Sequence, residues 1–213
     1  MFATRTGRAL LGYGAALAAC ALLGWFAFVR GSRVPVLWYV DFGFHELGHL
    51  VTAPFPRTFM LLAGSVGQVA VPLGLAAYFL FRRRDLAATG IMLAWTGTSA
   101  WDVSVYIADA PIEALPIVGA VHDWATLLGP GGWDALPAAA GIAGAVSAAG
   151  LVALLTGMAL CLGGAATALL GTRQSAPVRA PAAATIVVRP ARPVDDDSWT
   201  PRVRPIARVE PPE

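Results

Sequence analysis

Long apolar stretches dominate this chain and limit what it can fold into. Five of them follow one another, at residues 10–29, 34–53, 59–81, 86–108 and 137–171. A helix needs about 20 apolar residues to cross the ~30 Å hydrocarbon core of a bilayer. In hydrocarbon a helix also satisfies all of its own backbone hydrogen bonds. We therefore expect an all-α integral membrane protein, a helical bundle of about five transmembrane or re-entrant segments.

The composition agrees with a membrane-embedded chain. Charged residues make up 13% of the sequence and hydrophobic residues 57%, whereas soluble domains carry about 25% charged residues. The formal net charge of +2 does not indicate nucleic-acid binding. All 15 basic residues are Arg, and Ala and Gly are abundant, as in proteins from GC-rich bacterial genomes. We expect the lipid bilayer as a partner and the bacterial plasma membrane as the location.

The carboxy-terminal residues have a different composition. Residues 172–213 hold eight Pro, seven Arg and the acidic run Asp195–Asp197. Such a segment buries too little apolar surface to offset the entropy cost of ordering it. We therefore predict a membrane domain at 1–171 and a disordered tail at 172–213. The stretch at 137–171 would extend about 52 Å as one helix, so it either projects from the membrane or breaks near Gly157 or Gly163–Gly164.

Arginine positions predict an orientation for most of the chain. Cytoplasmic loops are enriched in Arg, so Arg82–Arg84 and the Arg-rich tail should face the cytoplasm. The loop at 109–136 then lies outside. The side of the amino terminus stays open, because Arg residues flank the first apolar stretch at both ends.

The second apolar stretch contains the pattern H-E-x-x-H, formed by His45, Glu46 and His49. Residues four apart share one helix face, so both imidazoles can bind one zinc ion while the Glu activates a bound water. Ionisable groups cost several kcal/mol to bury in a membrane, and for that reason they usually mark a functional site. We predict one Zn²⁺ at this motif. Both cysteines lie in apolar stretches, so the expected ligands are His and carboxylate groups.

A catalytic zinc usually has three protein ligands and an open position for water. Two residues compete for the third place. Asp102 has the expected depth on a neighbouring helix, and His122 is the one histidine outside the motif. The residue that is not a ligand is expected to orient a ligand ring. Gln68, Asp109 and Asp123 should lie near the same membrane face, where they can contact substrate or support the ligands.

The motif and its membrane setting resemble the site-2 protease family of intramembrane zinc metalloproteases. This resemblance covers residues 34–110 at most and implies that His45 and His49 bind zinc and that Glu46 is the general base. It also implies that Asp102 is the distant Asp ligand on a later membrane helix. The chain departs from the family in two ways: Val103 follows Asp102 where the family commonly has Gly, and the Arg distribution places the site outside rather than toward the cytoplasm.

Three functions are compatible with these residues. The first, which the resemblance favours, is a zinc metalloprotease that cleaves a membrane-protein segment. The second is a zinc hydrolase that acts on a lipid or another small amphiphile. The third is a non-catalytic scaffold in which the metal only holds helices together. A Glu46→Gln substitution separates an enzyme from a scaffold, because it removes the base and leaves the expected ligands in place.

Overall fold

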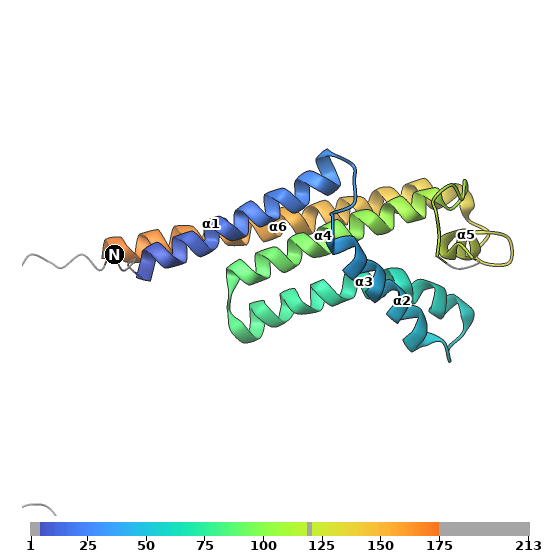
Figure 1. The fold of residues 1–213 in the computed structure, drawn as a ribbon, viewed down its shortest axis with the longest axis horizontal. Coiled ribbons are helices and arrows are strands. Elements are labelled where there is room, and N and C mark those ends of the chain that lie inside the picture. Colours follow the sequence, from blue (N-terminus) through green and yellow to red (C-terminus); the bar gives the residue numbers. More distant parts are fainter. Residues whose placement is uncertain (1–4, 119–120, 175–213) are drawn as a thin grey trace, which may run out of the picture. The chain divides into compact units, whose positions relative to one another are not determined.

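The computed structural model describes residues 5–118 and 121–174, so nearly all of the predicted tail lies outside the described residues. The described residues form six α-helices (Figure 1): α1 (Arg5–Gly24), α2 (Leu37–Thr52), α3 (Arg57–Tyr78), α4 (Leu86–Asp109), α5 (Asp123–Leu128) and α6 (Ala139–Gln174). Short π-helical turns extend α1 over Trp25–Val29 and α3 over Phe79–Arg83. No strand occurs within these ranges. The chain is all-helical, as the apolar stretches predict.

Three helical segments are long and apolar enough to cross a membrane: Thr6–Val29, Arg57–Arg83 and Leu136–Leu170. The helices α2 and α4, which correspond to the other two expected segments, do not meet the same criteria of length and hydropathy. The helix α2 has only 16 residues, fewer than the ~20 that a span needs. The helix α4 is long, but its buried face is rich in Thr, Ser and Gly. The structure therefore supports a membrane protein with at least three candidate spans.

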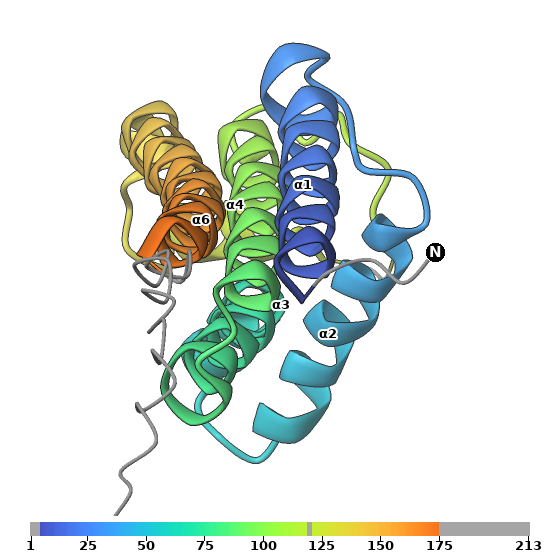
Figure 2. The same cartoon turned by 90° about the vertical axis from the view of Figure 1, so that its left-hand side faces the viewer.

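Glycine pairs bring α4 and α6 into backbone contact. A Cβ on Gly97 would lie 2.5 Å from the carbonyl oxygen of Gly150. Gly90 faces Gly157 in the same way, with 2.7 Å between its Cβ position and the carbonyl oxygen. The pairs are seven residues apart on both helices, so they recur on one face after about two turns. Small residues allow this close approach, which stabilises helix pairs in a membrane. The helix α1 packs against both α4 and α6, and Figure 2 shows it running beside α4.

The helix α6 is a single uninterrupted helix of 36 residues. The expected alternative of a break near Gly157 or Gly163–Gly164 is therefore wrong. Gly157 lies in the contact with α4 and does not interrupt the helix. At 1.5 Å per residue α6 extends about 54 Å, which is more than the hydrocarbon core requires.

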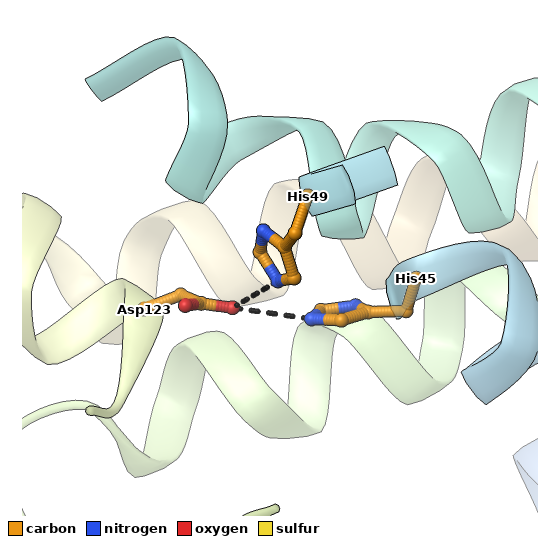
Figure 3. Close-up of side chains that lie close together, drawn as sticks. All are labelled: His45, His49 and Asp123. Atoms are coloured by element: carbon orange, nitrogen blue, oxygen red, sulfur yellow. Dashed lines mark hydrogen bonds and ion pairs between the residues drawn. The ribbon is translucent and has the colours of Figure 1, made fainter. Parts of the chain in front are cut away.

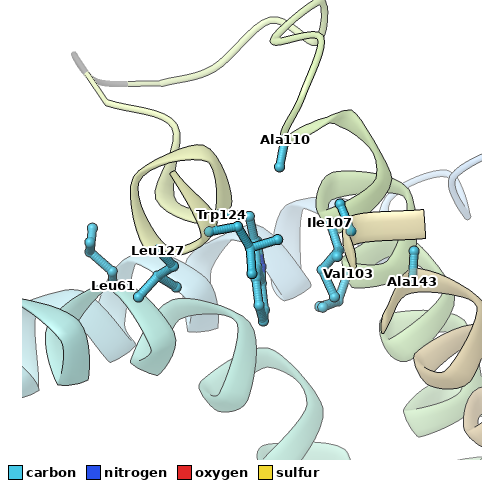
Figure 4. Packing of buried hydrophobic residues seen from close by; sticks show 9 residues of the cluster. Leu61, Val103, Ile107, Ala110, Trp124, Leu127 and Ala143 are labelled. Carbon is cyan, nitrogen blue, oxygen red and sulfur yellow. The ribbon is translucent and has the colours of Figure 1, made fainter. Parts of the chain in front are cut away.

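Residues 121–136, the second part of the predicted loop, lie against the end of the bundle and include α5. This short helix packs against α3 and α4 through an apolar cluster that includes Leu61, Ile107, Trp124 and Leu127 (Figure 4). The indole N–H of Trp124 also donates to Ser65 Oγ at 3.0 Å. This attachment places Asp123, the first residue of α5, next to α2.

The helices α2 and α3 approach each other closely at the H-E-x-x-H motif. Gly48, inside the motif, has no side chain, and a Cβ there would collide with the carbonyl group of Ala63. Glycine at this position thus lets the two backbones touch. The contact places the rings of His45 and His49 against α3.

Candidate metal centre

Three potential metal ligands meet where α2, α3 and α5 come together. The Nε2 atom of His45 lies 3.1 Å from Asp123 Oδ2, and Nε2 of His49 lies 3.2 Å from the same oxygen (Figure 3). One ligand atom from each residue lies within 4.8 Å of the others. His45, His49 and Asp123 therefore form a group that could hold a metal ion.

In each ring Nε2 faces Asp123, and Nδ1 on the other side lies next to a hydrogen-bond acceptor. These acceptors determine where the proton of each neutral ring lies. His49 Nδ1 lies 2.7 Å from the carbonyl oxygen of Met60, and a carbonyl can only accept. His45 Nδ1 lies 3.0 Å from Gln68 Oε1. With the proton of each neutral ring on Nδ1, both Nε2 lone pairs face Asp123, and the 3.1 Å contact between His45 Nε2 and Asp123 Oδ2 then needs a cation or a second proton between the two atoms. Metal-binding histidines usually have such a partner on their second nitrogen.

With both histidines neutral and Asp123 ionised, the three ligand atoms repel one another, and a cation between them would remove this repulsion. Two Nε2 lone pairs and a carboxylate oxygen converge, and all three repel one another unless a cation or added protons lie between them. Tetrahedral zinc with ligand bonds of 2.0–2.1 Å would separate its ligand atoms by about 3.3 Å. Two of the three separations, at 3.1 Å and 3.2 Å, are close to that value, and all three are within 4.8 Å. The donor set, two imidazoles and one carboxylate, also suits zinc.

Gly64 of α3 provides the space beside the two rings. A Cβ on Gly64 would lie 2.6 Å from Nε2 of His45 and 2.6 Å from Nε2 of His49. Any larger residue would therefore occupy the region that both lone pairs face. Nothing in the local sequence marks Gly64, because its importance depends on the contact between α2 and α3.

The structure places the two expected third ligands in other interactions. Asp102 Oδ1 accepts a hydrogen bond from Arg33 Nε at 2.9 Å, and its Oδ2 accepts from Gln68 Nε2 at 3.3 Å. Among the described residues, Gln68 thus links Asp102 to His45. Asp123, which the sequence placed beside the ligands, is the residue that the structure groups with the two rings.

His122 caps the amino end of α5, where its Nδ1 accepts a hydrogen bond from the backbone N–H of Ala125 at 3.1 Å. Its buried Nε2 lies 3.3 Å from Asp109 Oδ2, without hydrogen-bond geometry. Asp109 in turn accepts from the backbone N–H groups of Ala114 and Leu115. These two predicted site residues therefore shape the loop that leads to Asp123.

Tyr106 of α4 fixes the backbone next to the group. Its hydroxyl oxygen accepts a hydrogen bond from the N–H of Asp123 at 3.0 Å, and its ring packs 4.2 Å from the ring of His122. The phenol proton is not used in this bond, so it can be donated elsewhere. Nothing in the sequence distinguished Tyr106, because its role follows from the position of α5.

A cavity of about 430 Å³ adjoins the group. His45, His49, Glu46, Tyr106 and Asp123 all line it. Its remaining wall is largely apolar and includes Trp38, Phe42, Leu61, Leu115, Ile117 and Val121. The side chain of Glu46 is exposed within this setting. The volume lies in the range of 300–1,000 Å³ that is usual for ligand-binding clefts.

No protein-family model matches the chain, and neither a curated protein nor a solved structure does. The geometry of the site therefore has to support any functional conclusion. The likeness to site-2 proteases stays a prediction from the motif and its setting.

Proposed function

We propose that the protein is a membrane-embedded zinc-dependent hydrolase. In this proposal His45, His49 and Asp123 hold one Zn²⁺ and Glu46 is the general base. The observation that supports it most directly is the convergence of two imidazole lone pairs and a carboxylate on the wall of a cleft. A metal that served only to join helices would not need an adjoining cavity with a free carboxylate in it.

The proposed setting is a bundle of five segments in the plasma membrane. α2 and α4 would complete the three apolar spans. α4 can be less hydrophobic than the others because α1, α3 and α6 surround it and reduce its contact with lipid. We propose that the loop at 109–136 and the cleft face the outside and that the carboxy-terminal tail faces the cytoplasm.

Residues around the metal group would each have one role in hydrolysis. Bound zinc would supply Lewis acidity and lower the pKa of a coordinated water to about 7. Glu46 would accept the proton of that water and transfer it to the leaving group. Tyr106, which still has its hydroxyl proton, would donate a hydrogen bond to negative charge that develops on the substrate oxygen. Gln68 and the carbonyl of Met60 would keep the two rings oriented.

Two substrate classes fit this proposal. A membrane-protein segment is the class that the motif favours, and its scissile peptide would lie in the cleft. The cavity offers a specific reason to consider a second class, because its size and apolar wall suit a small amphiphile such as a lipid with an amide or ester bond. Both classes would use the same water and the same base.

The substitution Glu46→Gln tests the proposal. The variant should bind as much zinc as the wild type and lose hydrolysis, because the amide cannot accept the proton. Purified full-length protein would be incubated with isolated bacterial membranes, and released peptides and lipid fragments would be measured by mass spectrometry. Glu113→Gln is the matched control, since Glu113 is exposed and does not line the cleft.

The outcomes separate the candidate functions. Products that the wild type and Glu113→Gln release, and that Glu46→Gln does not, support a hydrolase and identify its substrate class. Equal product release by all three proteins would exclude Glu46 as the base. Zinc binding without any release in the three samples would favour the scaffold.

A further inference from the structure

We propose that Asp102 is a positioning residue of the metal centre, which acts on His45 through the amide of Gln68. In this arrangement the carboxylate decides which nitrogen of the His45 ring carries the proton. The inference deepens the proposed function and rests on it, because the ring orientation matters only if His45 binds a metal. Its physical basis can nevertheless be measured without metal.

A chain of polar contacts leads from Asp102 to His45. Gln68 Nε2 donates to Asp102 Oδ2 at 3.3 Å, and the backbone carbonyl of Ser99 lies 3.5 Å from the same nitrogen. On the other side of the amide, Oε1 lies 3.0 Å from His45 Nδ1. Only 4% of Gln68 is exposed, so solvent offers its amide few competing partners.

The acceptors around Gln68 determine the orientation of its amide. The oxygen and nitrogen ends of an amide have nearly the same shape, so hydrogen bonding selects between them. An ionised carboxylate and a carbonyl can only accept, so the NH₂ end must face Asp102 and Ser99. The oxygen end must then face His45, and His45 Nδ1 must donate to it.

The reversed amide would disable the site. Its NH₂ group would point at His45 Nδ1, which would then have to accept with a lone pair. The proton of the neutral ring would move to Nε2, the nitrogen that faces Asp123 at 3.1 Å. A protonated Nε2 cannot bind a metal. Asp102 therefore favours metal binding by excluding this arrangement.

Arg33 holds Asp102 in place from the connection between α1 and α2. Its Nε donates to Asp102 Oδ1 at 2.9 Å, and its guanidinium lies 4.8 Å from the centre of the Trp38 ring. The connection ends in a tight turn at Val36, where φ is 66° and the N–H of Leu37 donates to the carbonyl of Pro35. A β-branched residue rarely adopts such a φ, so the backbone is strained next to this contact.

Asp41 provides an internal comparison. It is also a buried carboxylate between α2 and α4, with 4% exposure. It accepts hydrogen bonds from Trp95 Nε1 and Ser99 Oγ, both at 2.7 Å. In the described part of the chain neither Gln68 nor His45 is among its hydrogen-bond partners, so an Asn there should not affect the ring.

The first experiment compares Asp102→Asn with Asp41→Asn in full-length protein purified in detergent. Asparagine can present either an oxygen or an NH₂ group to Gln68, so it no longer selects one amide orientation. Asp102→Asn should weaken zinc affinity by about tenfold, the lower end of the range for groups that support metal ligands. Asp41→Asn should bind zinc like the wild type.

The second readout is the ring itself. The chain has three histidines, so ¹⁵N-histidine labelling gives three imidazoles whose protonated nitrogen can be identified by NMR, with His122→Gln as an aid to assignment. Metal-free wild type should carry a proton on His45 Nδ1, with any second proton of the ring shared between Nε2 and Asp123. Asp102→Asn should show a mixture of both ring forms, and a role for Asp102 in stability alone would not cause that change.

A double substitution tests the mechanism by rescue. Gln68→Glu alone places two carboxylates next to each other, which is unfavourable. Gln68→Glu combined with Asp102→Asn restores one carboxylate and one amide, with the carboxylate now facing His45. The double variant should recover zinc affinity and the Nδ1 proton of His45.

Several results would overturn the inference: an unchanged His45 ring in Asp102→Asn, wild-type zinc affinity in that variant, or no recovery in the double variant. If Asp102→Asn does not fold, Asp102→Ser removes the same acceptor-only group and permits the same comparison. A wild type that binds no zinc, with a His45 ring that still responds to Asp102→Asn, would contradict the proposed function and leave the orienting role of Asp102 intact.

Discussion

The indole N–H of Trp124 donates to Ser65 Oγ at 3.0 Å, and this bond ties α5 to α3. Both partners are buried. Because Trp124 follows Asp123 directly, the bond also limits where the third ligand can lie. The metal centre thus depends on a contact between residues 59 positions apart in the sequence.

Trp124→Phe should loosen this attachment and keep an aromatic ring in the cluster. The variant loses one hydrogen bond and leaves Ser65 Oγ without its donor, which should lower the free energy of unfolding by about 1–3 kcal/mol. Zinc affinity should fall as well, because Asp123 becomes less well positioned. Thermal unfolding in detergent and zinc titration would measure both effects. Trp133→Phe is the control, since Trp133 is about half exposed.

Gly64→Ala should prevent metal binding with little effect on the rest of the fold. The added methyl group would lie 2.6 Å from both Nε2 atoms and would displace the rings or the ion. Gly74→Ala is the matched control on the same helix, because a Cβ there meets nothing within 4 Å. Zinc bound per chain in the two variants checks this prediction. Equal zinc in both would show that the space beside Gly64 is not the metal site.

Val36→Gly should make the protein more stable. Glycine adopts a positive φ without strain, and relief of such strain is worth about 1–3 kcal/mol, reduced by the greater entropy of glycine in the unfolded chain. We expect a higher temperature of unfolding in detergent. A lower temperature would mean that the Val36 side chain contributes more than its backbone costs, although 76% of the residue is exposed.

Gly97→Ala should destabilise the contact between α4 and α6. The new Cβ would lie 2.5 Å from the carbonyl oxygen of Gly150, and overpacking of this kind costs about 1–3 kcal/mol. Gly144→Ala on α6 is the control, because its Cβ meets nothing within 4 Å. Unfolding of both variants in detergent would measure the difference. Equal stability would argue against the backbone contact between the paired glycines.

The sequence predicted the helices well because apolar length is a local signal. The expected stretch at 86–108 corresponds to α4 at Leu86–Asp109, and that at 34–53 contains α2. The motif likewise predicted that His45 and His49 share a helix face. Local patterns do not show which apolar stretches contact lipid. The sequence therefore predicted five segments, whereas three helices of the structure have the length and hydropathy needed to cross a membrane.

The third member of the metal group could not be predicted from local patterns. Asp123 is 78 residues from His45, and it reaches the rings only because α5 packs on α3 and α4. The sequence placed Asp102 at the same membrane depth as the motif, and the structure does bring it next to Gln68. Depth alone could not reveal that Gln68 lies between Asp102 and the ring. The sequence did place Asp123, next to His122, near the same membrane face as the motif, but as a supporting residue and not as a ligand.

Zinc binding by purified full-length protein tests the central claim most directly, with Asp123→Asn compared against Asp134→Asn, a change in the same loop outside the cleft. We predict that the wild type and Asp134→Asn each bind one zinc ion per chain, and that Asp123→Asn binds it far more weakly because a charged ligand is lost. A wild type that binds no divalent metal, or an Asp123→Asn variant with wild-type affinity, would contradict the assignment of His45, His49 and Asp123 as the metal centre.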